Sequence, residues 1–269
     1  MNVITKEKIK EDLLKIGLKT GDIVIVHSSL KSIGHVENGP NTVIDAFLEV
    51  LEKKGTLVMP TFTDSFPTRP GYEPFHFKKT ASTVGLITDI FWKRSGVLRS
   101  THPSHSVAAC GYYAEEFIKD HTEKSSAIGI DSPLHKAAKK GALVLFLGTS
   151  FASCSLGHVA EVIAQAPYID IPVYGAEDCE IIDDQGNKKI IHYTKEIPGD
   201  GSGFRKLKPI LEEKGLLKKE FIGNAESMLI KGMDIINVAV EMIKKEPFSL
   251  LCNKENCEPC KKRKSLTKI

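Results

Sequence analysis

Near the N-terminus, the apolar positions follow two different spacings, which predict two kinds of element. From Thr5 to Ile16 they recur with helical period, and Gly17 ends the pattern as a glycine commonly ends a helix. From Ile23 to Val26 they form an unbroken β-branched run, which is typical of a strand buried on both faces. The chain therefore opens with an amphipathic helix and a buried strand, and the polar residues His27-Ser28-Ser29 follow the strand directly.

The same alternation continues along the chain. Val43 to Gly55 has helical period and leads into a predicted strand at Thr56 to Pro60, and a second helix and a third strand are expected around Val84 to Trp92 and at Ala142 to Gly148. Strand, helix, strand is the order of parallel crossover units. We therefore predict an α/β protein with three layers (α/β/α) and a central, mostly parallel sheet, in which ligands collect beyond the carboxyl ends of the strands.

Three other regions have different patterns. Thr61 to Lys79 contains three prolines and no clear period, which predicts a long ordered loop. Cys179 to Tyr193 is typical of a small antiparallel hairpin that turns at Asp184 to Asn187. Glu226 to Lys245 is predicted to be helical. No linker or repeat interrupts these segments, so we expect a single domain over residues 1–248 and a cysteine-containing basic C-terminal tail over residues 249–269.

Composition narrows the classes of function. The 37 basic residues nearly balance the 34 acidic ones, and a net charge of +3 gives no reason to expect a nucleic-acid partner. No run approaches the roughly 20 apolar residues that span a bilayer, and the N-terminus lacks a signal-peptide core. We therefore expect a cytoplasmic protein without a membrane partner, and a homodimer is a further expectation.

Two polar segments could bind an anionic ligand. The serine- and glycine-containing loop from His27 to Pro40 follows a buried strand, so its hydroxyls and N–H groups could hold a phosphate or a pantetheine amide. In the segment from Arg99 to Gly111, Arg99 could pair with a phosphate and His102 could donate to a ligand. The alternative is structural in both cases: the serines cap local turns, Pro103 builds a turn, and Arg99 forms a surface ion pair.

A third segment, Ser155 to Gln165, places a histidine beside a carboxyl group. If a helix begins near Ser155, His158 and Glu161 lie three residues apart on one face and interact. The helix N-terminus favours a neutral imidazole, the form that a general base requires, while Glu161 acts in the opposite direction. The alternative is a packed or solvated histidine next to an N-terminal charge.

Taken in order, four blocks of the sequence resemble the aminoglycoside 3-N-acetyltransferase family. They are HSSLKSIG with its VIDAFLEVLEKKGTLVMPTFT continuation, TASTVGLITDIFWKRSGVLRSTHPSHSVAACG, IGIDSPLHKAAKKGALVLFLG and SCSLGHVAEVIA. The resemblance covers nearly the whole chain. It implies an α/β/α acyltransferase that carries the acetyl group of acetyl-coenzyme A directly to an amine of an aminoglycoside or amino-sugar-like substrate, an activity linked to antibiotic resistance.

The resemblance also assigns site residues. It implies a cofactor-binding set of His27, Ser28, Ser29, Leu30, Ser32, Ile33, Gly34, Arg99, Ser100, His102 and Ser106, and a catalytic set of His158, Glu161 and Glu196. His158 would be the general base, and one of the two glutamates would orient it or hold a substrate ammonium. The chain departs from the family pattern at Ser155 and Gly157, where threonine and leucine are usual, and in its C-terminal residues. These departures indicate an outlying branch whose natural substrate need not be an antibiotic.

Two other functions stay open at this stage. A non-catalytic CoA- or sugar-binding protein would share the loop after His27 without needing His158. A serine hydrolase would use Ser28 or Ser29 as its nucleophile, although neither serine lies in a GxSxG elbow.

The six cysteines fall into two groups. Cys110, Cys154 and Cys179 are scattered and are predicted to be free thiols. Cys252, Cys257 and Cys260 could ligate zinc if a fourth ligand came from elsewhere in the chain, and the alternative is three reduced thiols in a basic tail. We assign no metal ligand to the catalytic site.

Overall fold

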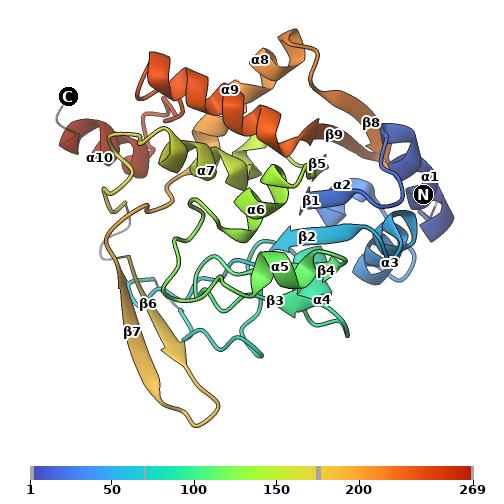
Figure 1. Cartoon of the computed structure of the whole chain (residues 1–269), viewed down its shortest axis with the longest axis horizontal. Coiled ribbons are helices and arrows are strands. Elements are labelled where there is room, and N and C mark those ends of the chain that lie inside the picture. The colour runs from blue at the N-terminus through green and yellow to red at the C-terminus, as the bar shows by residue number, and fades with distance from the viewer. Residues whose placement is uncertain (1–2, 70, 174–176, 268–269) are drawn as a thin grey trace.

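The main sheet has seven strands in the order β3-β4-β2-β1-β5-β9-β8 (Figure 1). The computed structural model describes residues 3–69, 71–173 and 177–267. The strands are β1 (Ile23–Ser28), β2 (Thr56–Pro60), β3 (Leu98–Arg99), β4 (Val107–Gly111), β5 (Leu143–Leu147), β8 (Lys218–Ile222) and β9 (Ala225–Lys231). The central strands β2, β1 and β5 are parallel, and the pairings outside them are antiparallel.

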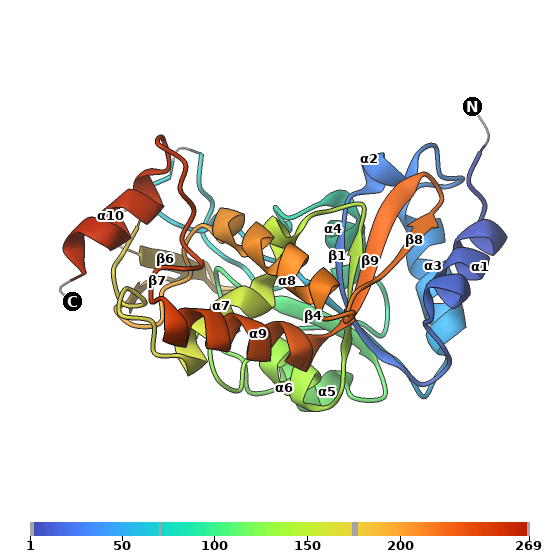
Figure 2. The same ribbon diagram turned by 90° about the horizontal axis from the view of Figure 1, so that it is seen from above.

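Helices cover both faces of this sheet (Figure 2). One face carries α1 (Lys6–Ile16), α2 (Leu30–Ile33), α3 (Pro40–Leu51) and α4 (Leu86–Trp92), and the other carries α5 (Ala114–Ile118), α6 (Pro133–Lys139), α7 (Ser155–Ile163), α8 (Leu207–Glu213) and α9 (Gly232–Lys245). Each face buries its own apolar core. Ile23 and Ile25 of β1 belong to one core and Val24 to the other, because successive side chains of a strand alternate between faces.

The predicted α/β class is confirmed, as is the first helix. Thr5 caps α1 by accepting from the Lys8 N–H at 3.3 Å, and Gly17 ends it with φ 115°, a left-handed conformation that favours glycine. The predicted antiparallel hairpin is also present, as β6 (Glu177–Ile182) and β7 (Lys188–Tyr193). It forms a separate two-stranded sheet that projects from the body of the protein (Figure 1).

The prediction of a continuous helix from Glu226 to Lys245 is wrong in its first part. Ala225–Lys231 is the strand β9, which pairs with both β5 and β8, and α9 begins only at Gly232. The apolar run inside β9 fits a strand buried between two neighbours as well as it fits a helix. Its partners on the sheet, the adjacent strand β8 and the distant strand β5, decided the outcome.

The C-terminal residues pack against the protein. Leu250 and Leu251 are buried in the core on the α7–α9 side, and α10 (Glu258–Leu266) buries Cys260 and Arg263. The predicted division into residues 1–248 and 249–269 stays a prediction. Among the described residues, none of the helices has the length and apolarity needed to cross a membrane.

Candidate active site

A cavity of about 360 Å³ opens at the carboxyl ends of the three parallel strands. His27 and Ser28 of β1, Pro60 at the end of β2 and Thr149 just after β5 all line it. Side chains that follow parallel strands converge at one edge of the sheet, which is where ligands bind in open α/β folds. The first two residues of the predicted polar loop, His27 and Ser28, therefore lie beside the cavity.

Helix α7 brings His158 to the cavity wall. The His158 Nδ1 and the Glu161 Oε2 lie 2.7 Å apart, and both residues are buried. The Tyr168 hydroxyl donates to the Glu161 Oε1 at 3.0 Å, so both carboxyl oxygens are occupied. Because Nδ1 is held by Glu161, Nε2 is the ring nitrogen left for a ligand. The arrangement matches the orientation of a general base by a buried carboxylate.

Steric crowding explains why a glycine, Gly157, precedes His158. A Cβ at Gly157 would lie 2.6 Å from the Phe204 ring, and that ring packs edge-on against the His158 imidazole with centroids 4.7 Å apart. Phe204 belongs to a short 3₁₀ helix, Gly201–Lys206. Gly157 therefore makes room for an aromatic ring that packs against the His158 imidazole.

The seven predicted cofactor residues from His27 to Gly34 divide between the cavity and the fold. His27 and Ser28 line the cavity, and burial lowers the pKa of His27 to about 4. The Ser32 Oγ lies 2.9 Å from the Ser29 Oγ and 3.0 Å from the Gly148 carbonyl oxygen, within hydrogen-bonding distance of both. These bonds fix the turn into α2. The remaining members, Leu30, Ile33 and Gly34, do not line the cavity; Leu30 and Ile33 pack into the core on the α1–α4 side, and Gly34 has φ 103°.

The Arg99 side chain donates to the protein itself. It bonds the Thr80 carbonyl at 2.6 Å, the Thr61 carbonyl at 3.1 Å and the Ser106 Oγ at 3.1 Å, and it lies 4.2 Å from the centre of the Trp92 ring. Burial lowers the pKa of the guanidinium to about 10. Arg99 and Ser106 thus join the long loop after β2 to the edge of the sheet, and neither lines the cavity.

Ser100 and His102 are also held by neighbouring groups. The Ser100 Oγ accepts from the Val107 N–H and lies 2.9 Å from the His121 Nδ1. The His102 ring stacks between His121 and Tyr193, at centroid distances of 4.9 and 5.1 Å. Their assignment to the cofactor stays a prediction, as does that of the other site residues. Neither residue is among those that line the cavity.

The cavity wall carries two acidic and two basic side chains. Asp64 and Arg69 form an ion pair on the long loop, while Lys195 and Glu196 follow the hairpin. Glu196 has φ 50°, and its N–H donates to the Asp170 carboxyl at 2.7 Å. The predicted residue Glu196 therefore does reach the cavity, although no direct bond joins it to His158 within the described part of the chain.

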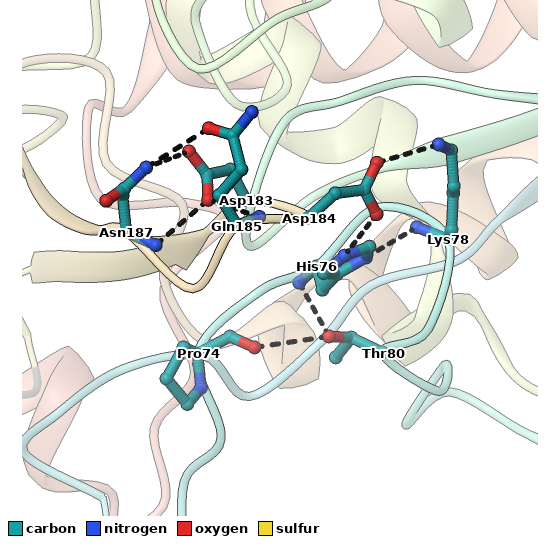
Figure 3. A network of polar contacts seen from close by, with 8 residues as sticks. All are labelled: Pro74, His76, Lys78, Thr80, Asp183, Asp184, Gln185 and Asn187. Atoms are coloured by element: carbon teal, nitrogen blue, oxygen red, sulfur yellow. Dashed lines mark hydrogen bonds and ion pairs between the residues drawn. The ribbon is translucent and has the colours of Figure 1, made fainter.

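The long loop and the hairpin support one another at their outer ends (Figure 3). The Asp184 carboxyl contacts His76 Nε2 at 3.1 Å and accepts from Lys78 Nζ at 2.9 Å, while Thr80 closes the loop through the Pro74 carbonyl and the His76 N–H. The loop prediction for Thr61 to Lys79 is borne out: the described residues there form no named helix or strand. The network steadies two walls of the cavity that are more than a hundred residues apart in sequence.

Sequence reasoning missed His105 as a lining residue. It lies beside Phe62 with ring centroids 4.6 Å apart, its Nδ1 contacts the Ser104 Oγ at 2.8 Å, and it lines the cavity. Burial lowers its pKa to about 3, and the positive charge of nearby groups acts in the same direction. The sequence singles out the segment from Arg99 to Gly111, but no spacing rule tells which of its two histidines faces a cavity. Lys195 and Tyr193 also line the cavity and were also missed, because no pattern along the chain relates them to it.

Comparison with known proteins gives a consistent picture. A family model described as aminoglycoside 3-N-acetyltransferase matches residues 25–244. The chain is 31% identical over 248 residues to aminoglycoside N(3)-acetyltransferase IV of a Salmonella species, covering 91% of this chain and 90% of that protein. It is 28% identical over 262 residues to aminoglycoside N(3)-acetyltransferase VII of Streptomyces paromomycinus, covering 88% of this chain and 90% of that protein. The solved structure of a histidine-to-alanine mutant of the aminoglycoside acetyltransferase AAC(3)-IVa, in complex with a gentamicin, superposes with a TM-score of 0.86 at 28% identity over 98% of each chain.

Proposed function

This chain belongs to the aminoglycoside 3-N-acetyltransferase family, and we propose that it transfers the acetyl group of acetyl-coenzyme A to an amine of an aminoglycoside or a related amino sugar. The observation that carries the proposal is the pair of His158 and Glu161 at the cavity wall, 2.7 Å apart, with one imidazole nitrogen left over. We expect the reaction to take place in the cytoplasm, where acetyl-CoA is available.

His158 acts as the general base. Neutral imidazole with its proton on Nδ1 donates to the Glu161 carboxylate and presents the Nε2 lone pair to the substrate. An amine attacks a thioester only when it is unprotonated, so Nε2 removes the amine proton as the C–N bond forms. The C–S bond breaks, and CoA leaves as a thiolate that can take back this proton. Tyr168 keeps Glu161 in place throughout.

The thiol in the cavity wall is a poor candidate for an acetylated-enzyme intermediate, which favours direct transfer of the acetyl group from CoA to the amine. Cys154 lines the cavity at the start of α7, but burial raises the pKa of its thiol to about 12. A thiol that stays protonated at neutral pH is a poor nucleophile. The serine-hydrolase alternative is weakened in part by Ser29, whose Oγ already accepts from Ser32 and which does not line the cavity.

The charges of the cavity suggest how the amine is received. Asp64 and Glu196 can hold ammonium groups, and Arg69 and Lys195 balance them, so this cavity is not a purely acidic one. An ammonium group of the substrate would compete with Arg69 for Asp64, whereas an anionic group of the substrate could contact Lys195. We therefore include amines that also carry a phosphate, such as nucleotide-linked amino sugars, among the candidate acceptors.

A thiol-release assay with acetyl-CoA tests the proposal on a panel of aminoglycosides, amino sugars and nucleotide-linked amino sugars. Wild type should release CoA only with an accepted amine, and His158→Ala should lower kcat by about 10²–10⁴-fold while CoA affinity is kept. His192→Ala is the matched control, because His192 is an exposed hairpin histidine that pairs with Asp178, away from the catalytic pair. Release that persists in His158→Ala would contradict the role of the base. CoA binding without release for any amine would favour a binding protein, and release without an amine would favour a hydrolase.

A further inference from the structure

Three cysteines and one aspartate from distant parts of the chain come together beside α10. The potential ligand atoms of Asp200, Cys252, Cys257 and Cys260 all lie within 4.8 Å of one another. The Cys257 thiol donates to the Asp200 carboxyl at 3.2 Å, and the Cys252 N–H donates to the Cys260 sulfur at 3.4 Å. All three thiols are free. Asp200 supplies the fourth ligand that the sequence near the cysteines lacks.

We propose that these four side chains bind one zinc ion. Tetrahedral zinc with Zn–S bonds of about 2.3 Å and a Zn–O bond of about 2.1 Å separates its ligand atoms by roughly 3.5–3.8 Å. The observed separations therefore need only small side-chain rotations to close around an ion. The ligand types also select zinc, because thiolates exclude magnesium and calcium, and a closed set of four protein ligands is typical of structural zinc.

The surroundings compensate the charge that such a site would carry. Three thiolates and a carboxylate around Zn²⁺ leave a net negative charge. Two lysines are held next to it through backbone carbonyls: Lys206 donates to Ser249 at 2.8 Å and to Leu251 at 2.7 Å, and Lys264 donates to Cys252 at 3.1 Å. Buried or part-buried cations around a ligand cluster are what an anionic metal centre requires.

The site would tie the C-terminal residues to a wall of the cavity. Asp200 stands between Gly199 and Gly201, which both line the cavity, and it caps the 3₁₀ helix that carries Phe204. Phe204 packs against His158. All four ligands come from the protein, which leaves no position open for a substrate, so the role of the ion is structural.

A second contact runs from α10 to the same region. The buried Arg263 donates to the Ile197 carbonyl and lies 5.3 Å from the centre of the Tyr168 ring. Tyr168 in turn bonds Glu161. Helix α10 lies at the α7–α9 end of the molecule, far from α1 and α3 (Figures 1 and 2). Zinc would thus fix this helix so that Arg263 and the segment around Asp200 support the catalytic pair from outside.

The metal content of the full chain tests the proposal without relying on the acetyl-transfer reaction. The protein purified without chelator should hold about one zinc per chain by elemental analysis, and replacement by Co²⁺ should give the thiolate-to-cobalt absorption of a tetrahedral site. Cys260→Ser should lose the metal, and Asp200→Asn should weaken zinc binding by about tenfold or more. Cys110→Ser is the matched control, since Cys110 is a free cysteine in β4.

Zinc removal should also lower the thermal midpoint of the wild type, because metal binding contributes to folding where the site forms only in the folded state. Because the thermal midpoint is compared between wild type with zinc and wild type without it, this measurement does not depend on whether a variant folds. The proposal would be overturned if wild type grown with added zinc contained no zinc. It would also be overturned if Cys257 and Cys260 were joined in a disulfide, or if zinc remained bound in Cys260→Ser.

Discussion

Two polar clusters, one around His158 at the cavity wall and one around Arg99 outside the lining, differ in what their side chains bond. In the first, Glu161 and Tyr168 hold one nitrogen of His158 and leave the other toward the cavity. In the second, Arg99 directs its donors to two carbonyls and a serine of its own chain. A cluster with a ring nitrogen left over can act on a ligand, whereas a side chain that donates to carbonyls and a hydroxyl of the protein holds the fold together.

The difference teaches where catalytic function should be sought in this protein. The sequence singled out both clusters, and the resemblance assigned both to the site. Their hydrogen bonds separate them, because Arg99 would have to break bonds inside the protein to meet a cofactor. We therefore expect substitutions around His158 to change rates and substitutions around Arg99 to change stability.

The largest effect is expected from Glu161→Gln. A glutamine amide can donate to Nδ1 and leave the proton on Nε2, which removes the base, so kcat should fall by about 10³-fold, as happens when a buried carboxylate that orients histidine is neutralised. Steady-state kinetics and CoA titration measure this. The control is Glu116→Gln, an exposed carboxylate paired with Lys140 on the surface. Turnover within a few-fold of wild type would mean that Glu161 is only a packing group.

Arg99→Met is expected to lower the free energy of unfolding by about 2 kcal/mol, because the Thr80 carbonyl loses its Arg99 donor and the Thr61 carbonyl keeps only the Ser106 hydroxyl. Urea denaturation measures the loss. Arg94→Met should cost less than about 1 kcal/mol, since the Arg94–Asp45 ion pair is partly exposed. If Arg99→Met instead keeps its stability and loses CoA affinity, the comparison fails and Arg99 belongs to the cofactor site.

Gly157→Ala should cost about 2 kcal/mol of stability through overpacking, and it should lower kcat, because the new Cβ pushes Phe204 against His158. Combining it with Phe204→Leu should recover part of both losses. Denaturation and kinetics on the two single variants and the double variant form the test. A stabilised Gly157→Ala variant would show that helix propensity outweighs the contact with the ring.

At neutral pH the smallest effect is expected from His121, whose contribution to stability changes only in acid. Burial lowers the pKa of His121 in the folded protein to about 4, against about 6.5 in the unfolded chain. Between these values the unfolded chain binds more protons, so stability is full above about pH 6.5 and falls as the pH drops toward 4, by at most about 1.4 kcal/mol per pH unit.

Urea denaturation at several pH values in this window checks the prediction. His121→Gln should flatten the slope by this amount, and the exposed-histidine control His192→Gln should leave it as in wild type. An unchanged slope in His121→Gln would mean that His121 does not titrate differently in the folded and unfolded states.

By itself, the sequence determined the features that depend on neighbours along the chain. Helical period and a terminal glycine located α1, the β-branched run located β1, and turn residues located the hairpin. The spacing of His158 and Glu161 already implied their contact, because residues three apart share a helix face. Four ordered blocks of residues were also enough to identify the family, since their order and spacing are properties of the chain alone.

Only the tertiary structure decided which of these polar residues meet. It made Ala225–Lys231 a strand by giving it two partners, turned His105 rather than His102 toward the cavity, and brought Tyr168 to Glu161. It also carried Asp200 to the three C-terminal cysteines. Apart from the β8–β9 hairpin, these contacts join residues that no local pattern relates, since the packing of helices on the sheet, and not the spacing along the chain, sets their distance.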